Sequence, residues 1–109
     1  STFNRNDSED LIKILDLCKK YDKDVWIWSG YSLDDIYHKD KRILDKVDVM
    51  VEGKYDKDKR NLNLFYRGSS NQRIIFMHEP KSECNFKYYV CSFKDNGYSV
   101  TEYNSDYDN

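Results

Sequence analysis

The sequence predicts an α/β fold with parallel strands, followed by a C-terminal antiparallel β-hairpin. Two short apolar runs, Val25–Trp28 and Val47–Val51, each follow a segment with helical character. An order of helix, strand, helix, strand is typical of parallel strands joined by right-handed crossovers. The hairpin is indicated by the turn Lys94–Gly97 between two aromatic runs, residues 86–93 and 98–103. Its Asn-Gly pair tolerates the positive φ angles that tight hairpins need.

The first predicted helix covers residues 8–21. Its candidate N-caps are Asn6, Asp7 and Ser8, since short polar side chains accept hydrogen bonds from the first amides of a helix. Apolar residues that recur at helical spacing are expected to form its buried stripe: Leu11, Ile14, Leu15 and Cys18. Because the strand Val25–Trp28 is apolar at every position, we expect it to be covered on both faces.

Ser32 and Asp35 predict the start of a second helix, because their spacing is that of a capping box. A further helical piece is expected at residues 41–46. After the second strand, the alternation of apolar residues at 62–66 suggests a short strand. The apolar run at residues 74–77 predicts another.

The chain has 109 residues, which is enough for one compact domain. Within it we expect an α/β part at residues 1–78 and an appended hairpin with a polar tail at 79–109. The net charge of −2 argues against a nucleic-acid-binding protein of the simple electrostatic kind. Residues 38–73 nevertheless carry ten basic and six acidic groups between acidic flanks. This region is either a surface that attracts an anionic ligand or partner, or a solvated loop.

Several functional classes find no support in the sequence. No apolar run is long enough to span a membrane and no signal peptide is visible, so no membrane association is expected. Cys18, Cys84 and Cys91 form no C-x-x-C pair, which argues against a zinc or redox motif. We expect reduced thiols and a cytoplasmic location. No catalytic triad, zinc-protease motif or phosphate-binding loop is present, so a self-sufficient hydrolase or metal enzyme is not indicated.

Three short polar segments point to function. The first ends a strand with Ser29, Gly30 and Tyr31, and its small residues let a ligand approach the backbone at the carboxyl end of a strand. The second ends the next strand with Glu52, Gly53 and Lys54. The third is a polar turn that consists of Arg67, Gly68, Ser69, Ser70, Asn71, Gln72 and Arg73. The alternatives are, in order, a turn that caps a strand, a surface ion pair, and a self-bonded turn that orders the following chain.

Trp28–Tyr31, Val51–Lys54 and Arg67–Arg73 together resemble the W-T-G-Y, V-D-G-K and R-G-S-S-N-Q-R segments of a known family. The family is that of the anaerobic ribonucleotide reductase activating proteins, radical S-adenosylmethionine (SAM) enzymes that install a glycyl radical on the reductase. The resemblance is to their C-terminal half and covers about Thr2–Phe76. Ser29 replaces the usual threonine, and Glu52 replaces the usual aspartate. The resemblance implies a partial, radical-SAM-type (βα) half barrel that carries the hairpin as an addition.

The resemblance also implies roles for the three segments. Residues Ser29, Gly30, Tyr31, Glu52 and Lys54 would contribute to a SAM pocket, with Lys54 as a point charge for the SAM carboxylate. The turn Arg67–Arg73 would bind a partner. The family's C-x-x-x-C-x-x-C loop and G-G-D/E-P segment are absent, and Thr2–Asn6 resembles the loop after the latter. Without the thiolates that hold a 4Fe-4S cluster, SAM binding is expected only with a complementary N-terminal half.

Two functions remain open at this point. In the first, the chain is the C-terminal piece of an activating protein, from a split gene or a truncation, and is inactive alone. Its partners are then the N-terminal half and the anaerobic ribonucleotide reductase. In the second, it is a phage or mobile-element module whose tyrosine-rich hairpin binds and inhibits a host protein or defence complex. Half a barrel leaves a strand edge that the hairpin, a second copy or a partner has to cover, so a homodimer is also left open.

Overall fold

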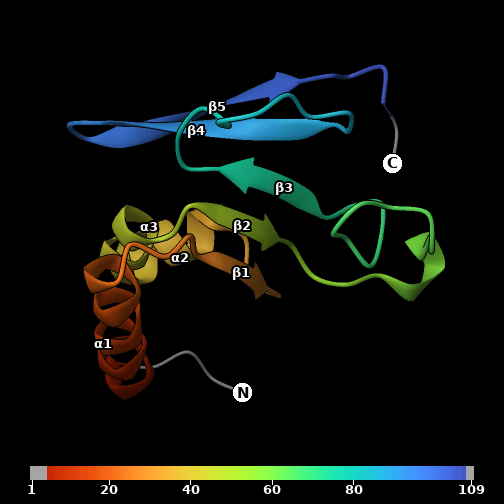
Figure 1. Ribbon diagram of the computed structural model, residues 1–109. Coiled ribbons are helices and arrows are strands. Elements are labelled where there is room, and N and C mark those ends of the chain that lie inside the picture. Colours follow the sequence, from red (N-terminus) through yellow and green to blue (C-terminus); the bar gives the residue numbers. More distant parts are fainter. Residues whose placement is uncertain (1–4, 108–109) are drawn as a thin grey trace.

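The computed structural model describes residues 5–107 of the chain, and it has an α/β architecture. Five strands form one open sheet in the order β1-β2-β3-β4-β5, with three α-helices packed against one of its faces (Figure 1). The helices are α1 (Arg5–Lys20), α2 (Leu33–Asp40), α3 (Arg42–Lys46) and the short 3-10 helix η1 (Lys57–Lys59). The strands are β1 (Trp26–Ser29), β2 (Val49–Glu52), β3 (Arg73–Phe76), β4 (Tyr88–Lys94) and β5 (Gly97–Tyr103). The predicted α/β class and the C-terminal hairpin are therefore confirmed.

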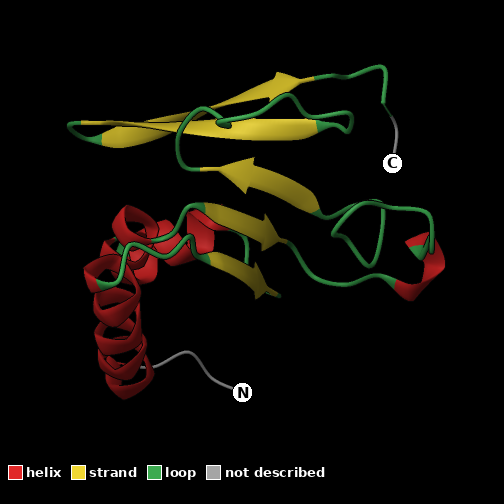
Figure 2. Cartoon of the chain, in the orientation of Figure 1, coloured by secondary structure: helices red, strands yellow, loops and turns green. Residues whose placement is uncertain are grey.

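The sheet is mixed rather than parallel throughout. β1 and β2 are parallel, as predicted, with Trp26 opposite Val49. β3 is antiparallel to β2, β4 is parallel to β3, and β5 is antiparallel to β4. The helix–strand alternation stops after β2, because the chain reaches β3 through a loop whose one helical piece is η1 (Figure 2). The sequence repeat thus predicted the direction of the first pair and not that of the others.

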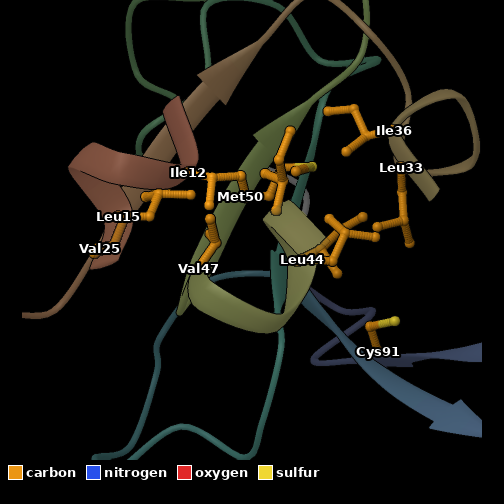
Figure 3. Packing of buried hydrophobic residues seen from close by; sticks show 11 residues of the cluster. Ile12, Leu15, Val25, Leu33, Ile36, Leu44, Val47, Met50 and Cys91 are labelled. Carbon is orange, nitrogen blue, oxygen red and sulfur yellow. The ribbon is translucent and has the colours of Figure 1, made fainter. Parts of the chain in front are cut away.

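Two apolar clusters cover the two faces of the sheet. On the helical face, Met50 of β2 packs with buried residues of all three helices (Figure 3). On the opposite face, Val49 and Val51 pack with aromatic residues of the loops and of β3 and β4. All four residues of β2 are buried as a result. β2 therefore has both of its faces covered.

Helix α1 differs from the prediction at two points. It begins at Arg5, so Asn6, Asp7 and Ser8 lie inside the helix and not at its N-cap. Of the segment 2–6, the first three residues lie outside the described part of the chain. Ile14 is 58% exposed whereas Ile12 is only 8% exposed, because the helix packs on the core through Ile12 and Leu15. Cys18 packs against the same core, as expected.

Two strand predictions are wrong. β1 is an edge strand and Trp28 is 59% exposed, so the strand is not covered on both faces. Residues 62–66 form turns and bends rather than a strand. Tyr66 has a φ of +63°, which no β-strand adopts, and its carbonyl accepts a 2.7 Å hydrogen bond from Nε1 of Trp28. The aromatic ring of Tyr66 thereby lies against Trp26, with 4.8 Å between ring centroids.

The hairpin β4–β5 extends the sheet at the edge far from β1 (Figure 1). A side-chain contact ties it to the helical layer, because the Tyr98 hydroxyl donates to Oδ1 of Asp34 in α2. Burial, together with this hydrogen bond, raises the pKa of Tyr98 to about 12. The capping box predicted for α2 is present, with Ser32 and Asp35 as its two members. None of the helices in residues 5–107 is long and apolar enough to cross a membrane.

Asp48 joins three elements at the amino end of the parallel pair. Its Oδ2 accepts from the Val25 amide at 2.7 Å, and its Oδ1 lies 2.9 Å from Nε2 of His78. The Met77 amide donates to the Asp48 carbonyl at 2.9 Å. Burial opposes ionisation of Asp48, but the hydrogen bonds from His78 and Val25 outweigh it and lower the pKa. Hydrogen bonds to Asp48 and to the Glu79 carbonyl raise the pKa of His78 above its ordinary 6.5.

This junction predicts a pH-dependent stability. A raised folded-state pKa means that His78 stabilises fully below its unfolded value, and that this contribution is lost as the pH rises through the folded value. Urea unfolding should therefore show a lower stability at about pH 8.5 than at about pH 6. His78→Gln should reduce that decline, whereas His38→Gln, on α2, should leave it unchanged. A wild-type chain equally stable at both pH values would contradict this description.

Candidate functional site

The two predicted ligand-binding segments meet at the carboxyl ends of β1 and β2. Because β1 and β2 are parallel and in register, Ser29 lies opposite Glu52. The Gly53 amide donates a 3.3 Å hydrogen bond to the Tyr31 carbonyl, which joins the loop after β1 to the loop after β2. Gly53 has a φ of +107°, a conformation that side chains disfavour, so glycine is needed where the chain turns away from β2.

Glu52 is a buried carboxylate that links three elements. It is 4% exposed. Its Oε1 accepts from the Leu33 amide of α2 at 2.8 Å and from Nη2 of Arg73 in β3 at 3.0 Å. Nε of Arg73 donates to Oε2 at 3.3 Å. Both carboxylate oxygens are therefore occupied within the fold, and Glu52 fixes the start of α2 relative to β2 and β3.

Arg73 completes this arrangement from the neighbouring strand. The hydrogen bond to Glu52 raises the pKa of Arg73 against the effect of burial. Its guanidinium also lies over the ring of Tyr89 in β4, 5.2 Å from the ring centroid, which is a cation–π geometry. Arg73 thus connects the predicted SAM-binding segment to the hairpin, and its predicted role in partner binding stays a prediction.

Ser29 and its neighbours line a hollow on the helical side. Oγ of Ser29 accepts from the Tyr31 amide at 3.0 Å, so the hydroxyl closes a local turn and keeps its own hydrogen for donation. The hollow has a volume of about 350 Å³, and apolar residues of α1, β1, α2 and α3 form much of its lining: Leu11, Ile27, Ile36 and Ile43. A Cβ atom placed on Gly30 would meet nothing within 4 Å, so the backbone there is open to a ligand.

Lys54 lies in a different hollow. That hollow has a volume of about 400 Å³, and Tyr55, Lys57 and Asn71 also line it. Lys54 is exposed, and it takes part in no ion pair within the part of the chain that the structure describes. The structure therefore brings Ser29, Gly30 and Tyr31 together and joins them to Glu52 and Gly53, but it does not bring Ser29 and Lys54 into one cavity.

The Arg67–Arg73 turn is bonded to itself and to the loop after β2, mainly through Gln72. Oε1 of Gln72 accepts from the Gly68 amide at 2.9 Å and from the Ser69 amide at 3.2 Å. Nε2 of Gln72 donates to the Gly53 carbonyl at 2.9 Å. One amide side chain thus holds both ends of the long loop between β2 and β3. This agrees with the self-bonded alternative, while partner binding by the turn stays a prediction.

The other polar residues of the turn have similar roles. Ser69 is fully buried, and its Oγ accepts from the Asp56 amide at 3.1 Å. Nδ2 of Asn71 donates to the Lys54 carbonyl at 2.8 Å. Nη1 of Arg67 donates to the Gln72 carbonyl at 3.2 Å. The self-bonded turn was one of the sequence-based alternatives. The Glu52–Arg73 pair was not predicted, because its two residues are far apart in the chain; opposite charges at neighbouring strand ends were the available signal.

The described residues do not fit an iron–sulfur cluster. Thiolates hold such clusters, and within residues 5–107 no group of three or more His, Cys, Asp or Glu side chains is placed to hold a metal ion. Cys91 is buried in the core, and burial raises the pKa of its thiol to about 11. Cys18 and Cys84 are partly buried in different clusters. The cysteines are therefore separate core or near-core residues.

Removing the charge of Glu52 should destabilise the fold. Glu52→Gln keeps an acceptor for the Leu33 amide but leaves the guanidinium of Arg73 without its carboxylate. We expect a loss of about 2–3 kcal/mol in urea unfolding, below the usual cost for a fully buried pair because Arg73 is partly exposed. Glu102→Gln breaks a more exposed pair with Lys87 and should cost less than about 0.5 kcal/mol. Equal effects of the two substitutions would show that Glu52 does not hold the elements together.

Gln72 should matter more than its neighbour in the same turn. Gln72→Ala removes three hydrogen bonds to backbone groups, two of them partly buried, and we expect a loss of about 2 kcal/mol. Asn71→Ala removes one bond at an exposed residue and serves as the matched control. Hydrogen exchange should also accelerate at the Gly68 and Ser69 amides in the Gln72 variant alone. A Gln72 variant that behaves like the Asn71 variant would contradict the assigned role.

Comparison with known proteins agrees with the sequence resemblance. Three proteins named anaerobic ribonucleoside-triphosphate reductase-activating protein are similar to this chain. The one from Escherichia coli (strain K12) is 42% identical over 52 residues, 48% of this chain and 34% of the relative. The one from Haemophilus influenzae is 40% identical over 53 residues, 49% of this chain and 34% of the relative. The one from Enterobacteria phage T4 is 45% identical over 53 residues, 49% of this chain and 32% of the relative.

The matched segment therefore spans about a third of the length of these relatives. No solved structure matches the chain. The family model described as "4Fe-4S single cluster domain" matches residues 2–75. Since this match covers more than half of the sequence, the chain belongs to the 4Fe-4S single cluster domain family.

Proposed function

We propose that this chain supplies part of the SAM site of an anaerobic ribonucleotide reductase activating protein of the radical SAM type. It would act as the C-terminal portion, and a complementary N-terminal half would supply the cluster ligands. One observation carries the proposal. The Gly53 amide donates a hydrogen bond to the Tyr31 carbonyl at 3.3 Å, which joins the two family-like segments at the carboxyl ends of β1 and β2. Carboxyl ends of parallel strands are where α/β sheets bind ligands. The family match and the names of the relatives support the same reading.

The five proposed pocket residues have different tasks. Glu52 is a positioning residue, because both of its oxygens are occupied by Leu33 and Arg73. The exposed ammonium of Lys54 would bind the carboxylate of SAM. The hydroxyl of Ser29 would donate a hydrogen bond, and the open backbone at Gly30 and Tyr31 would let the ligand approach. Bound SAM would supply the radical chemistry, while these residues bind and orient it.

The positions of the cysteines explain why the cluster ligands are proposed to come from the complementary half. A cluster of this family needs several thiolates, and the matched range 2–75 contains only Cys18. Cys18 lies on α1 and packs against the core. The reductase would be the partner of the assembled protein, as the names of the relatives indicate. The half-barrel geometry is part of the same proposal, since an open sheet with parallel β1 and β2 provides the start of one.

The hairpin gives no independent support to the alternative of an inhibitory module. Several of its tyrosines are engaged within the fold: Tyr88 stacks on Tyr103, Tyr89 donates to Glu102, and Tyr98 donates to Asp34. The phage T4 relative carries the activating-protein name. An origin in a phage would therefore also agree with the first function.

Titration with SAM tests the proposal. The chain is co-expressed anaerobically with a complement fragment, defined as the part of the phage T4 relative that lies outside the matched segment. We expect SAM to bind the co-purified pair and not the chain alone. Lys54→Met should weaken binding by about tenfold, because it removes a charge-assisted contact. Lys57→Met is the matched control, since Lys57 lines the same hollow. Equal affinities of the two variants, or tight SAM binding by the chain alone, would contradict the proposal.

A further inference from the structure

One edge of the sheet is bare and carries none of the features that keep strand edges from pairing. Within residues 5–107, β1 has a hydrogen-bonded neighbour on one side only, namely β2. Its residues from Trp26 to Gly30 include no charge and no proline. Natural proteins usually blunt exposed edges with charged residues, prolines or bulges. The opposite edge strand, β5, does carry a charge at Glu102. The bare edge of β1 is therefore suited to pair with another strand.

The register shows which backbone groups point outward. The Val25 carbonyl accepts from the Val49 amide at 3.1 Å, so Val25 faces β2. In a parallel pair, alternate residues turn their N–H and C=O groups to the same neighbour. Ile27 and Ser29 therefore face β2 as well, while Trp26 and Trp28 turn their backbone groups to the bare edge.

The surface beside this edge includes apolar residues that are not buried in the core. Leu11 of α1 and Ile27 of β1 line the hollow of about 350 Å³ that opens next to the edge. Ile14 and Leu17 are 58% and 55% exposed. At roughly 100° per residue, they extend the apolar arc of α1 past Leu11, away from the core. An ordinary amphipathic helix would carry polar residues there.

We propose that the edge of β1, the hollow beside it and the Leu11–Ile14–Leu17 side of α1 form one docking surface for a strand–helix unit of the complementary, cluster-bearing half. The strand pairs with the outward N–H and C=O groups of Trp26 and Trp28. The helix of the same unit covers Ile14 and Leu17 and closes the hollow. This inference rests on the proposed function, and it adds the surface through which the missing part attaches.

The length of the relatives and the shape of the surface favour this occupant. The relatives extend well beyond the segment that this chain matches, which leaves enough chain for several further strand–helix units. In an α/β sheet, the strand of such a unit pairs with a strand edge, and its helix packs on a neighbouring apolar helix. The edge of β1 and the apolar side of α1 provide these two contact surfaces. A second copy of the chain would have to present the same edge, the same hollow and the same helix side to itself about a two-fold axis.

Two substitutions at one residue test the pairing. Trp28→Pro removes the outward N–H, and proline is tolerated at an edge strand whose N–H faces solvent. Trp28→Leu removes the same indole and its bond to Tyr66 but keeps the N–H, so it is the matched control. Binding of the complement fragment from the phage T4 relative is measured by pull-down titration. We expect Trp28→Pro to bind roughly tenfold or more weakly than Trp28→Leu. Thermal unfolding of the two variants alone should be similar.

Hydrogen exchange locates the contact and separates this inference from the proposed function. The Trp26 and Trp28 amides should become protected when the complement fragment binds, whereas the amides of β5 should not change. Protection at β5 instead, together with intact SAM binding, would overturn the docking surface and leave the proposed function standing. Absence of any association would overturn the docking surface directly. Sedimentation of the chain alone should show a monomer, and a dimer that Trp28→Pro dissociates would assign the surface to a second copy and contradict the proposal.

Discussion

The buried carboxylate of Glu52 is the interaction on which the arrangement of the candidate site depends. It accepts the Leu33 amide and the guanidinium of Arg73, so the end of β2, the start of α2 and the start of β3 are held at one point. A buried charge is tolerable only when such partners satisfy it. Because Glu52 is fixed in this way, Gly53 and Lys54 leave the sheet in one defined direction beside Tyr31. The acid of this segment therefore shapes the site from within the fold.

The two sides of the small sheet differ: the Arg67–Arg73 turn is closed by internal hydrogen bonds, whereas the edge of β1 is unpaired. The turn stabilises the long loop with hydrogen bonds from Gln72, Ser69 and Asn71, and β3 can therefore return antiparallel to β2 without a helical crossover. At the other side, no strand in the described residues pairs with the outer edge of β1, and Ile14 and Leu17 on the outer side of α1 are exposed. The sheet therefore ends at β1 with an unpaired edge, where one more strand would fit.

The sequence predicted much of this, for identifiable reasons. The strands and the hairpin follow from local apolar runs and from the Asn-Gly turn, and the capping box of α2 is a local signal. The direction of β3, the exposure of Ile14 and Trp28, and the absence of a strand at residues 62–66 depend on contacts between distant segments. The pairing of Glu52 with Arg73 is of the same kind. The family motifs predicted one pocket that includes Ser29 and Lys54, whereas the fold places these two residues in different hollows. The binding roles of these segments stay predictions.

The most direct test of the account is the iron content after anaerobic reconstitution with iron and sulfide. The chain alone should stay colourless and bind no stoichiometric iron, because its cysteines are separated in the fold. The chain co-purified with the complementary half should take up about four irons per pair, as a single 4Fe-4S cluster requires. A chain that assembles a cluster by itself, with the visible absorbance of an iron–sulfur protein, would contradict the claim that its cluster ligands come from elsewhere.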